Sequence, residues 1–310
     1  TLQTPKQFEE TKAFTDSFFS NDLDLLQSRV HDGRIRECHG DLHLGNICFW
    51  NGKLRLFDCI EFNDSLRFID VMNDAAFLAM DLDAAGRFDL STLFINSYVE
   101  WTGDWEGLQI LPLYTCMRAY VRAMVHSLAS SEPQAPPEEK EQAQHAARRY
   151  YELAWQYTQK KKGRLILVGG VSGSGKSTLA STLAQELRAI HIRSDAVRKH
   201  LAGLRLDEHG DQNVYSPEMK AKTYARLLEL GLLLAGRGFC VILDAKYDRR
   251  SFRRQAIDSA RQANLPLQLI QCTAPEPLLR SRISLRQNDV SDATADLLAN
   301  QLQEFEPLDE

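Results

Sequence analysis

The chain has 310 residues, enough for two ordinary domains, and 44% of them are hydrophobic, enough to fill a core in each. A formal net charge of -5 at pH 7 provides no basic field for nucleic acid or an acidic membrane surface, which argues against both partners. Six cysteines are scattered without paired metal-ligand spacing, which is typical of reduced thiols and predicts a cytoplasmic protein. The apolar run at 230–235 is far too short to span a bilayer.

The first elements in the chain are predicted to be helical. Apolar residues recur at about helical intervals over residues 5–30. A polar stretch, His39-Gly40-Asp41, follows and leads through Asn46 into two apolar runs, 47–50 and 53–57. Asn51-Gly52 separates these runs, and Asn-Gly in that position predicts a two-residue hairpin turn.

This hairpin should bring three oxygen-bearing side chains together at its open end. Asn46 and Asp58 flank the two strands, and Asp41 lies in the loop that leads in. A two-residue turn places Asn46 opposite Phe57, so the strands must end or bend if Asn46 and Asp58 are to hold one ion. Carboxylate and amide oxygens suit Mg²⁺, and an aspartate near an acceptor can receive a hydroxyl proton. The alternative is a polar loop capped by its own side-chain hydrogen bonds.

His39-Gly40-Asp41 with Asn46 resembles the catalytic loop of the aminoglycoside phosphotransferase and choline kinase family. The resemblance implies a mainly helical, protein-kinase-like C-terminal lobe that contains a β-hairpin and spans residues 1–130. In it Asp41 would be the catalytic aspartate, and Asn46 and Asp58 would be Mg²⁺ ligands. Such kinases also need an N-terminal lobe, which the 38 residues before His39 do not encode. Either that lobe lies in sequence missing from this chain, or this half no longer transfers phosphate. We expect truncation, because the catalytic loop retains all three polar residues and the chain starts at Thr1 without an initiator Met.

Helices predicted at 66–82, 90–101 and 108–129 would complete this lobe. Asp70 and Asp74 lie one turn apart on the first helix, where they would either brace the catalytic loop or form an exposed acidic face. Three prolines within 133–137 break the helical pattern and predict a hinge. Residues 131–162 are therefore expected to be a proline-rich linker and a long helix.

The second domain, 163–310, opens on the most specific motif of the chain. The apolar run 165–168 predicts a strand, and Gly170, Gly175, Lys176 and Ser177 then fit the P-loop (Walker A) pattern G-x-x-x-x-G-K-[ST]. Backbone N–H groups of such a loop wrap a phosphate chain, the lysine reaches the outer phosphates, and the serine offers Mg²⁺ an oxygen. ATP and Mg²⁺ are the predicted cofactors. The predicted nucleotide-binding residues are Gly170, Val171, Ser172, Gly173, Ser174, Gly175, Lys176, Ser177 and Thr178.

Strands and helices alternate from residue 164 onward. Strands at 165–168, 190–193, 239–243 and 267–272 predict an α/β domain with a parallel, doubly wound sheet, in which ligands bind at the carboxyl ends of the strands. At one such end, Asp244 occupies the position of a Walker B aspartate. Its expected role is to orient Mg²⁺, and the alternative is to cap the turn at the end of the strand. Asp195 follows another strand. It is expected to be either the N-cap of the next helix or the carboxylate that activates an acceptor hydroxyl. Arg198, one turn later, is suited to an anionic group.

Two arginine clusters follow. Arg280, Arg282 and Arg286 lie on a helix expected at 275–287, either as a lid over the transferring phosphate or as a solvated basic face. A second cluster is expected to be solvated and consists of Arg249, Arg250, Arg253 and Arg254. Only residues 294–310 remain after the lid, so we expect the last strand of the sheet to be absent.

The second half resembles P-loop kinases of the group that contains gluconate kinase, the polynucleotide kinase 5′-kinase module, chloramphenicol phosphotransferase and zeta toxins. The order of the halves resembles a bacterial fusion of an aminoglycoside phosphotransferase-like lobe with an AAA-family ATP-binding domain. These resemblances imply a Mg²⁺-dependent phosphotransferase that acts on a hydroxyl of a small molecule. Its catalytic residues would be Asp195, Lys176, Arg198, Arg280 and Arg286. Two alternative functions stay open: a regulatory ATP-binding module, and a toxin-like kinase that acts on a nucleotide sugar or an RNA end. The sequence also leaves open the acceptor and the oligomeric state.

Overall fold

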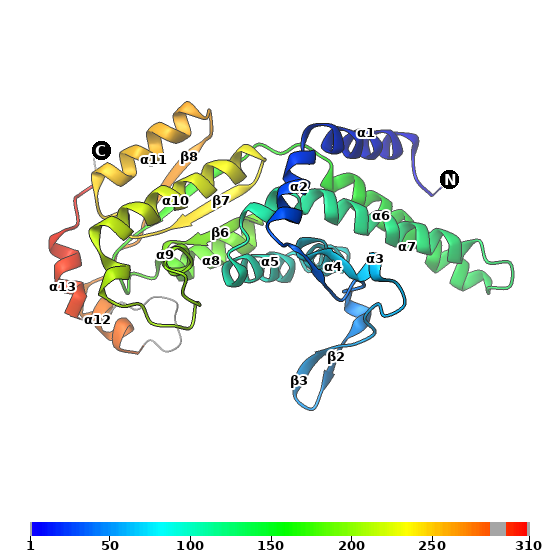
Figure 1. Cartoon of the computed structure of the whole chain (residues 1–310), viewed down its shortest axis with the longest axis horizontal. Helices are drawn as coiled ribbons and strands as arrows, with labels where there is room; N and C mark the ends of the chain where they lie inside the picture. Colours follow the sequence, from blue (N-terminus) through cyan, green and yellow to red (C-terminus); the bar gives the residue numbers. More distant parts are fainter. Residues whose placement is uncertain (1, 286–295, 309–310) are drawn as a thin grey trace. The chain divides into compact units, whose positions relative to one another are not determined.

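The computed structural model describes residues 2–285 and 296–308 (Figure 1). The chain divides into two compact units: the first comprises Thr1–Ser91 and Gly107–Lys160, and the second comprises Thr92–Glu106 and Lys161–Glu310. A segment from the first half of the sequence, Thr92–Glu106, thus belongs to the unit that carries the P-loop. Among the helices of the described part of the chain, none is both long and apolar enough to cross a membrane.

The first unit is mainly helical. Helix α1 (Pro5–Asn21) begins at a capping box, in which the Thr4 hydroxyl accepts from the Gln7 amide and the Gln7 side chain accepts from the Thr4 amide. Helix α2 (Leu23–His31) follows after a single residue. Residues of α4 (Val71–Ala84), α6 (Leu111–Ser130) and α7 (Pro137–Tyr157) form the core of this unit, and they include Phe77, Met80, Ala119, Ala147 and Tyr150.

The proline-rich stretch is the turn between α6 and α7, and α7 packs along α6 in the first unit. The long helix expected within 131–162 is therefore present as α7, whereas the proline-rich stretch is a turn inside the first unit and not the expected hinge. Prolines end a helix wherever they occur, and the same composition serves a turn between two packed helices as well as a hinge between domains.

A short strand interrupts the helix expected at 66–82. The chain instead forms α3 (Asp64–Arg67), β4 (Phe68–Asp70) and α4 (Val71–Ala84). Strand β4 pairs antiparallel with β1 (Ile35–Glu37), a partner about 35 residues away that local periodicity does not reveal. Asp70 ends the strand and caps α4, because its carboxylate accepts from the Met72 amide at 2.8 Å.

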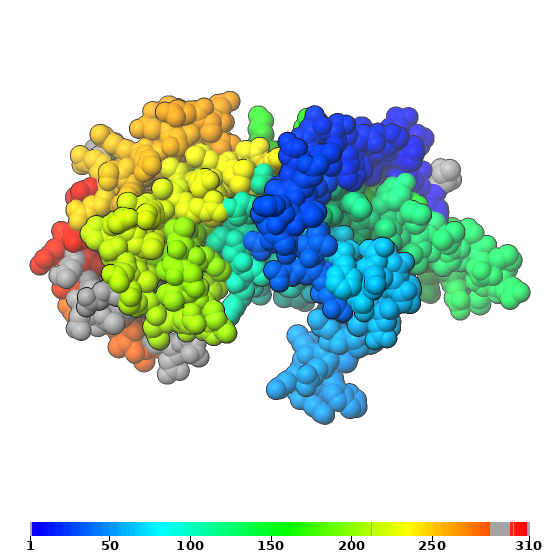
Figure 2. Space-filling model, viewed as in Figure 1, coloured from blue at the N-terminus to red at the C-terminus, as the bar shows by residue number. Residues whose placement is uncertain are grey.

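The predicted hairpin is confirmed as β2 (Ile47–Trp50) and β3 (Lys53–Leu56), which Figure 2 shows projecting from the first unit. Asn51 and Gly52 take φ values of 50° and 74°, as a two-residue turn with left-handed central residues requires. The Asn46 carbonyl accepts from the Phe57 amide at 3.1 Å, so these two residues lie opposite each other in the expected register.

The second unit contains the predicted parallel sheet. Its four strands are β5 (Arg164–Gly169), β6 (Ile190–Arg193), β7 (Cys240–Asp244) and β8 (Leu267–Gln271), in the order β6-β7-β5-β8. Helices pack on both faces. Ile166 and Val168 form a core cluster with Ala180 of α8 (Lys176–Leu187), whereas Leu165 and Leu243 contact Gly231 of α10 (Pro217–Gly236). The order places the carboxyl ends of β5 and β7 side by side, with Val168 paired to Asp244.

The remaining elements complete the description. Helix α5 spans Phe88–Thr102. The 3₁₀ helices are η1 (Leu44–Asn46), before β2, η2 (Glu106–Gln109), after α5, and η3 (Gln212–Tyr215), before α10. The other helices of the second unit are α9 (Ser194–Leu201), α11 (Arg250–Gln262), α12 (Glu276–Ser284) and α13 (Asp296–Gln303). The helix expected at 275–287 thus ends at Ser284, and Arg286 lies outside the described residues.

Candidate active site

The loop between β5 and α8 has a backbone that its glycines make possible. Gly170, Gly173 and Gly175 have φ values of 147°, 81° and 87°. A Cβ added at Gly170 would lie 2.7 Å from the Cys272 carbonyl oxygen, and one at Gly173 would lie 2.7 Å from the Leu279 carbonyl oxygen. The loop runs directly into α8, whose first N–H groups have no intrahelical acceptor and carry the positive end of the helix dipole. This geometry is suited to bind a phosphate chain.

Lys176, Ser177 and Asp244 meet beside this loop. Asp244 is 2% exposed, and burial alone would raise the pKa of its carboxyl group. The charge of Lys176 and hydrogen bonds from His191 and Ser177 outweigh burial and lower that pKa to about 2. Asp244 is therefore a charged carboxylate between the P-loop lysine and the P-loop serine.

His191 is a neighbour of Asp244 that the sequence reasoning missed. Its Nε2 atom lies 3.1 Å from Oδ2 of Asp244, and its side chain is 10% exposed. His191 and Asp244 lie on adjacent strands, β6 and β7, with Ile242 as the register partner of His191. Only the alternation along β6, in which Ile190 and Ile192 are buried and His191 is not, marks the position in the sequence.

The donor set fits Mg²⁺ bound together with a nucleotide. Oδ1 of Asp244 is buried and has no hydrogen-bond partner among the residues that the structure describes. In the same part of the chain, no three His, Cys, Asp or Glu residues are grouped so as to hold a metal ion by themselves. Mg²⁺ takes one or two protein oxygens and completes its shell with waters and substrate phosphates, so the Ser177 hydroxyl and the Asp244 carboxylate suffice.

Asp195 and Arg198 form an ion pair on α9. The N-cap of this helix is Arg193, so the capping role considered for Asp195 is wrong. Oδ1 of Asp195 lies 2.6 Å from Nη1 of Arg198, whose guanidinium stacks over the Tyr215 ring at 5.3 Å. Both charged groups lie close enough to Tyr224 to affect the pKa of its buried hydroxyl, which burial raises.

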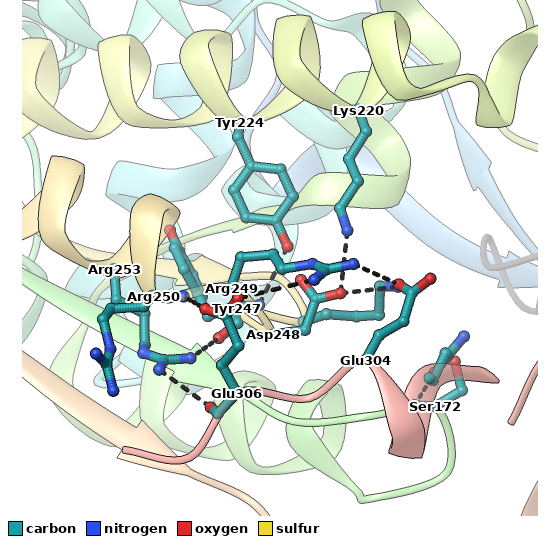
Figure 3. A network of polar contacts seen from close by, with 12 residues as sticks. Ser172, Lys220, Tyr224, Tyr247, Asp248, Arg249, Arg250, Arg253, Glu304 and Glu306 are labelled. Atoms are coloured by element: carbon teal, nitrogen blue, oxygen red, sulfur yellow. Dashed lines mark hydrogen bonds and ion pairs between the residues drawn. The ribbon is translucent and has the colours of Figure 1, made fainter. Parts of the chain in front are cut away.

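A second buried carboxylate, Asp248, follows β7 and anchors two lysines (Figure 3). Its Oδ2 atom lies 3.0 Å from Nζ of Lys220 and 3.3 Å from Nζ of Lys246. Burial lowers the pKa of Lys246 and the charge of Asp248 opposes that change. Tyr224 fixes the same loop, because its hydroxyl accepts from the Tyr247 amide at 3.1 Å. The sequence reasoning missed this cluster, although charged residues directly after a strand end, as in Asp244-Ala245-Lys246-Tyr247-Asp248, signal it.

The arginines after β7 are not a uniform solvated face. Arg253 is 4% exposed and donates to the carbonyl oxygens of Tyr247, Glu306 and Pro307, so the prediction of a solvated side chain is wrong for this residue. Arg249 pairs with Glu304 and Glu306 of the C-terminal segment, while Arg250 and Arg254 are exposed. Periodicity alone cannot distinguish an arginine that ties down carbonyl groups from one in water.

The helix expected to carry lid arginines reaches the P-loop through Arg282. Nη1 of Arg282 donates to the Gly173 carbonyl at 3.3 Å. Arg280, by contrast, is half exposed and pairs with Glu276 on its own helix. The C-terminal helix also contacts the loop, since the Gln301 side chain accepts from the Ser172 amide at 2.9 Å. Val171 packs in the same place against a cluster of apolar residues, which are Leu279, Ile283 and Leu298.

In the first unit the structure brings Asp41 and Asn46 together. Nδ2 of Asn46 donates to Oδ2 of Asp41 at 3.2 Å and to the Asp41 carbonyl at 3.0 Å. The expected brace is confirmed for Asp74, whose carboxylate accepts from the amides of His39 at 2.9 Å and Gly40 at 3.1 Å. Asp58 is exposed with a φ of 60°, and in the described chain no hydrogen bond or ion pair joins it to Asp41 or Asn46. Its metal role stays a prediction.

Asp70 has a different task from the one expected. It is buried and forms a bidentate pair with Arg29, with 2.7 Å between Oδ1 and Nη2, in addition to capping α4. It therefore ties α2 to the start of α4, and it is neither a brace for the catalytic loop nor part of an exposed acidic face.

Comparison with known proteins agrees with the geometry of the second unit. Residues 165–308 match a family model described as the AAA domain. The prediction of a P-loop α/β domain with a parallel sheet is thus confirmed for this part of the chain. The match does not extend into the first unit, where the likeness to aminoglycoside phosphotransferases stays a prediction.

Curated relatives extend over more of the chain. Uncharacterized proteins of Mycobacterium bovis and Mycobacterium tuberculosis are each 36% identical over 288 residues, which are 92% of this chain and 57% of theirs. The chain thus spans little more than half the length of these relatives. A shikimate kinase of Nitrobacter winogradskyi is 32% identical over 124 residues, 38% of this chain and 57% of the enzyme.

Solved structures show weaker similarity. A gluconokinase from Sinorhizobium meliloti is 22% identical, with a TM-score of 0.34 over 48% of this chain and 78% of that one. The Mycobacterium tuberculosis APS kinase CysC, solved in complex with AMPPNP and APS, is 24% identical, with a TM-score of 0.34 over 39% and 69% of the two chains. TM-scores this low carry no argument about the activity of the chain.

Proposed function

We propose that the second unit is an ATP- and Mg²⁺-dependent kinase that transfers the γ-phosphoryl group of ATP to a hydroxyl of a small molecule. One observation carries the proposal: Lys176, Ser177 and the charged, buried Asp244 meet at a glycine-built loop that opens a helix. A lysine, a metal-binding hydroxyl and a strand-end aspartate are the groups that a P-loop needs to hold a triphosphate with its metal. The sequence similarity to shikimate kinase supports a small-molecule acceptor.

Each group has a distinct task in the proposed reaction. Ser177 and Asp244 would hold Mg²⁺, which neutralises phosphate charge when it is bound. Lys176 and the first amides of α8 bind the phosphate chain. Asp195 orients the acceptor hydroxyl and receives its proton as the oxygen attacks the γ-phosphorus and ADP leaves. Arg282, at the Gly173 carbonyl, is better placed than Arg280 to stabilise charge on the transferring group.

For the first unit we propose a kinase-like catalytic lobe of the aminoglycoside phosphotransferase type. The contact between Asp41 and Asn46 and the brace from Asp74 support it, because they hold an aspartate and an amide in one rigid loop. In this proposal Asp41 would be catalytic, and Asn46 and Asp58 would hold a metal. No step of the reaction proposed for the second unit depends on these residues.

Lys176→Ala in the full chain tests the proposed function. Transfer is followed as ADP release with a panel of hydroxylated acids, sugars and nucleosides. We expect the variant to lose at least about 100-fold in activity, since a charge-assisted contact to phosphate in a dry site is worth about 3 kcal/mol. Lys222→Ala is the matched control, because Lys222 is 62% exposed and its ion pair with Glu218 lies at the surface. Unchanged binding and transfer in Lys176→Ala would place the site elsewhere, and ATP binding without any acceptor-dependent product would favour the regulatory alternative.

A further inference from the structure

The carboxylate of Asp244 is held from one side by His191. Nε2 of His191 lies 3.1 Å from Oδ2 of Asp244, and the two side chains are 10% and 2% exposed. A hydrogen bond between two such buried groups fixes the rotation of the carboxylate. The other oxygen, Oδ1, is buried without a hydrogen-bond partner in the described part of the chain. His191 thus occupies one oxygen and leaves the second available for the metal or its water.

His191 lies on a strand whose outer edge would otherwise be open. Strand β6 is at the end of the sheet, next to β7 alone. The side chain of Asn96 covers this edge, because its Nδ2 atom donates to the Ala189 carbonyl at 2.9 Å and its Oδ1 atom accepts from the His191 amide at 2.8 Å. One carboxamide thus makes both hydrogen bonds that a neighbouring strand would make.

Further contacts from the same segment of the second unit hold the end of β6 and the last turn of α9. The Glu100 carboxylate lies 3.8 Å from Nε of Arg193, and the Glu100 carbonyl lies 2.7 Å from Nε2 of His200. Trp105 packs edge-on against the His200 ring. Residues 92–106 therefore brace β6 along its length, although they stand about 60 residues before the P-loop motif.

We propose that His191 is a positioning residue for Asp244 and that Asn96 keeps His191 in place, so that segment 92–106 is part of the nucleotide and metal site. The proposal deepens the proposed function and rests on it, because it needs Asp244 to act beside Mg²⁺ and ATP. A chain of contacts carries it, from Asn96 to the His191 backbone, from the His191 ring to Asp244, and from Asp244 to Lys176 and Ser177.

The test measures ATP affinity of the full chain by calorimetry, once with Mg²⁺ and once with EDTA. His191→Leu removes the donor, and we expect it to weaken binding with Mg²⁺ about tenfold and to leave binding in EDTA unchanged. His191→Gln keeps a side-chain N–H and should stay within about threefold of the wild type. Asn96→Leu should act in the same direction as His191→Leu. His145→Leu is the control, since His145 is an exposed residue of the first unit.

Two outcomes would overturn the proposal while the proposed function stands. In the first, folded His191→Leu gains as much affinity from Mg²⁺ as the wild type does. The second is measured on the wild type, with His191→Gln used only to assign the signal. The ¹⁵N-labelled imidazole signal of His191 should move when Mg²⁺ is added to the ADP complex, and a stationary signal refutes the contact with the metal site. A wild type that binds ATP under neither condition would instead refute the proposed function.

Discussion

Replacing Asp244 by Asn removes a buried charge and keeps the shape of the side chain. Burial raises the pKa of this carboxyl group, but Lys176, His191 and Ser177 together lower it to about 2 from an ordinary value of 3.8. One pH unit corresponds to about 1.4 kcal/mol, so the charged form stabilises the folded second unit by about 2 kcal/mol. In metal-free buffer at pH 7, Asp244→Asn should lower the free energy of unfolding by this amount.

The pH dependence of that difference follows from the lowered pKa. Above the unfolded value of 3.8 the carboxyl group is charged in both states, and the full contribution is present. As the pH falls from 3.8 toward 2, the unfolded chain takes up a proton before the folded one does, and the contribution is lost. The gap between wild type and Asp244→Asn should therefore be constant from about pH 5 to pH 7 and fall to roughly half by about pH 3.

Urea unfolding followed by the fluorescence of Trp105 measures this gap, because Trp105 is 3% exposed and belongs to the second unit. The other tryptophans, Trp50, Trp101 and Trp155, are replaced by Phe in every protein compared. Asp207→Asn is the control, since its carboxylate is 53% exposed and forms a surface ion pair with Arg205, and it should show no resolvable gap. A gap that is absent at pH 7, or one that persists undiminished at about pH 3, would refute the arrangement of Lys176 around Asp244.

Two further predictions concern the first unit. Arg29→Met leaves the buried Asp70 without its cation and should lower the free energy of unfolding by about 3–5 kcal/mol. Urea unfolding with Trp155 as the fluorescence probe measures this change. Lys12→Met is the control, because it breaks an exposed ion pair and should lower the free energy of unfolding by less than about 1 kcal/mol. Burial raises the pKa of the Cys116 thiol to about 12, so maleimide at about pH 8 should label the exposed Cys48 first and Cys116 only after unfolding, as mass spectrometry of the peptides can show.

The features that could be predicted from the sequence are those with local causes. Glycine spacing around Lys176 and an apolar run on each strand depend on residues that are neighbours in the chain, and both the P-loop and the four strands lie where they were expected. The hairpin turn at Asn51-Gly52 is local in the same sense. Such patterns report backbone conformation and burial, and they need no knowledge of the partner element.

The features that could not be predicted depend on partners far along the chain. Strand β4 exists because β1 pairs with it, and no pattern within Phe68–Asp70 separates it from a helical start. In the sequence, Asn96 is one polar residue among others in a helical pattern. Its two hydrogen bonds at the edge of β6 become evident only from the packing. The same holds for Arg253, two of whose three carbonyl acceptors, those of Glu306 and Pro307, lie in the distant C-terminal segment. Contacts between side chains that are far apart in the sequence produce no periodic pattern of residues.

The strand order explains how one sheet would serve the two substrates of the proposed reaction. Strand β5 delivers the P-loop, and its neighbour β7 delivers Asp244. Strand β6 lies beyond β7 and delivers Asp195 and Arg198, whereas β8, on the other side of β5, leads to α12 with Arg282. Because parallel strands present their carboxyl ends at one edge, Asp195 and the P-loop follow strands that lie on opposite sides of β7, which carries Asp244. In the proposed reaction, a hydroxyl held at Asp195 would therefore approach the terminal phosphate from the β6 side, past the carboxylate of Asp244.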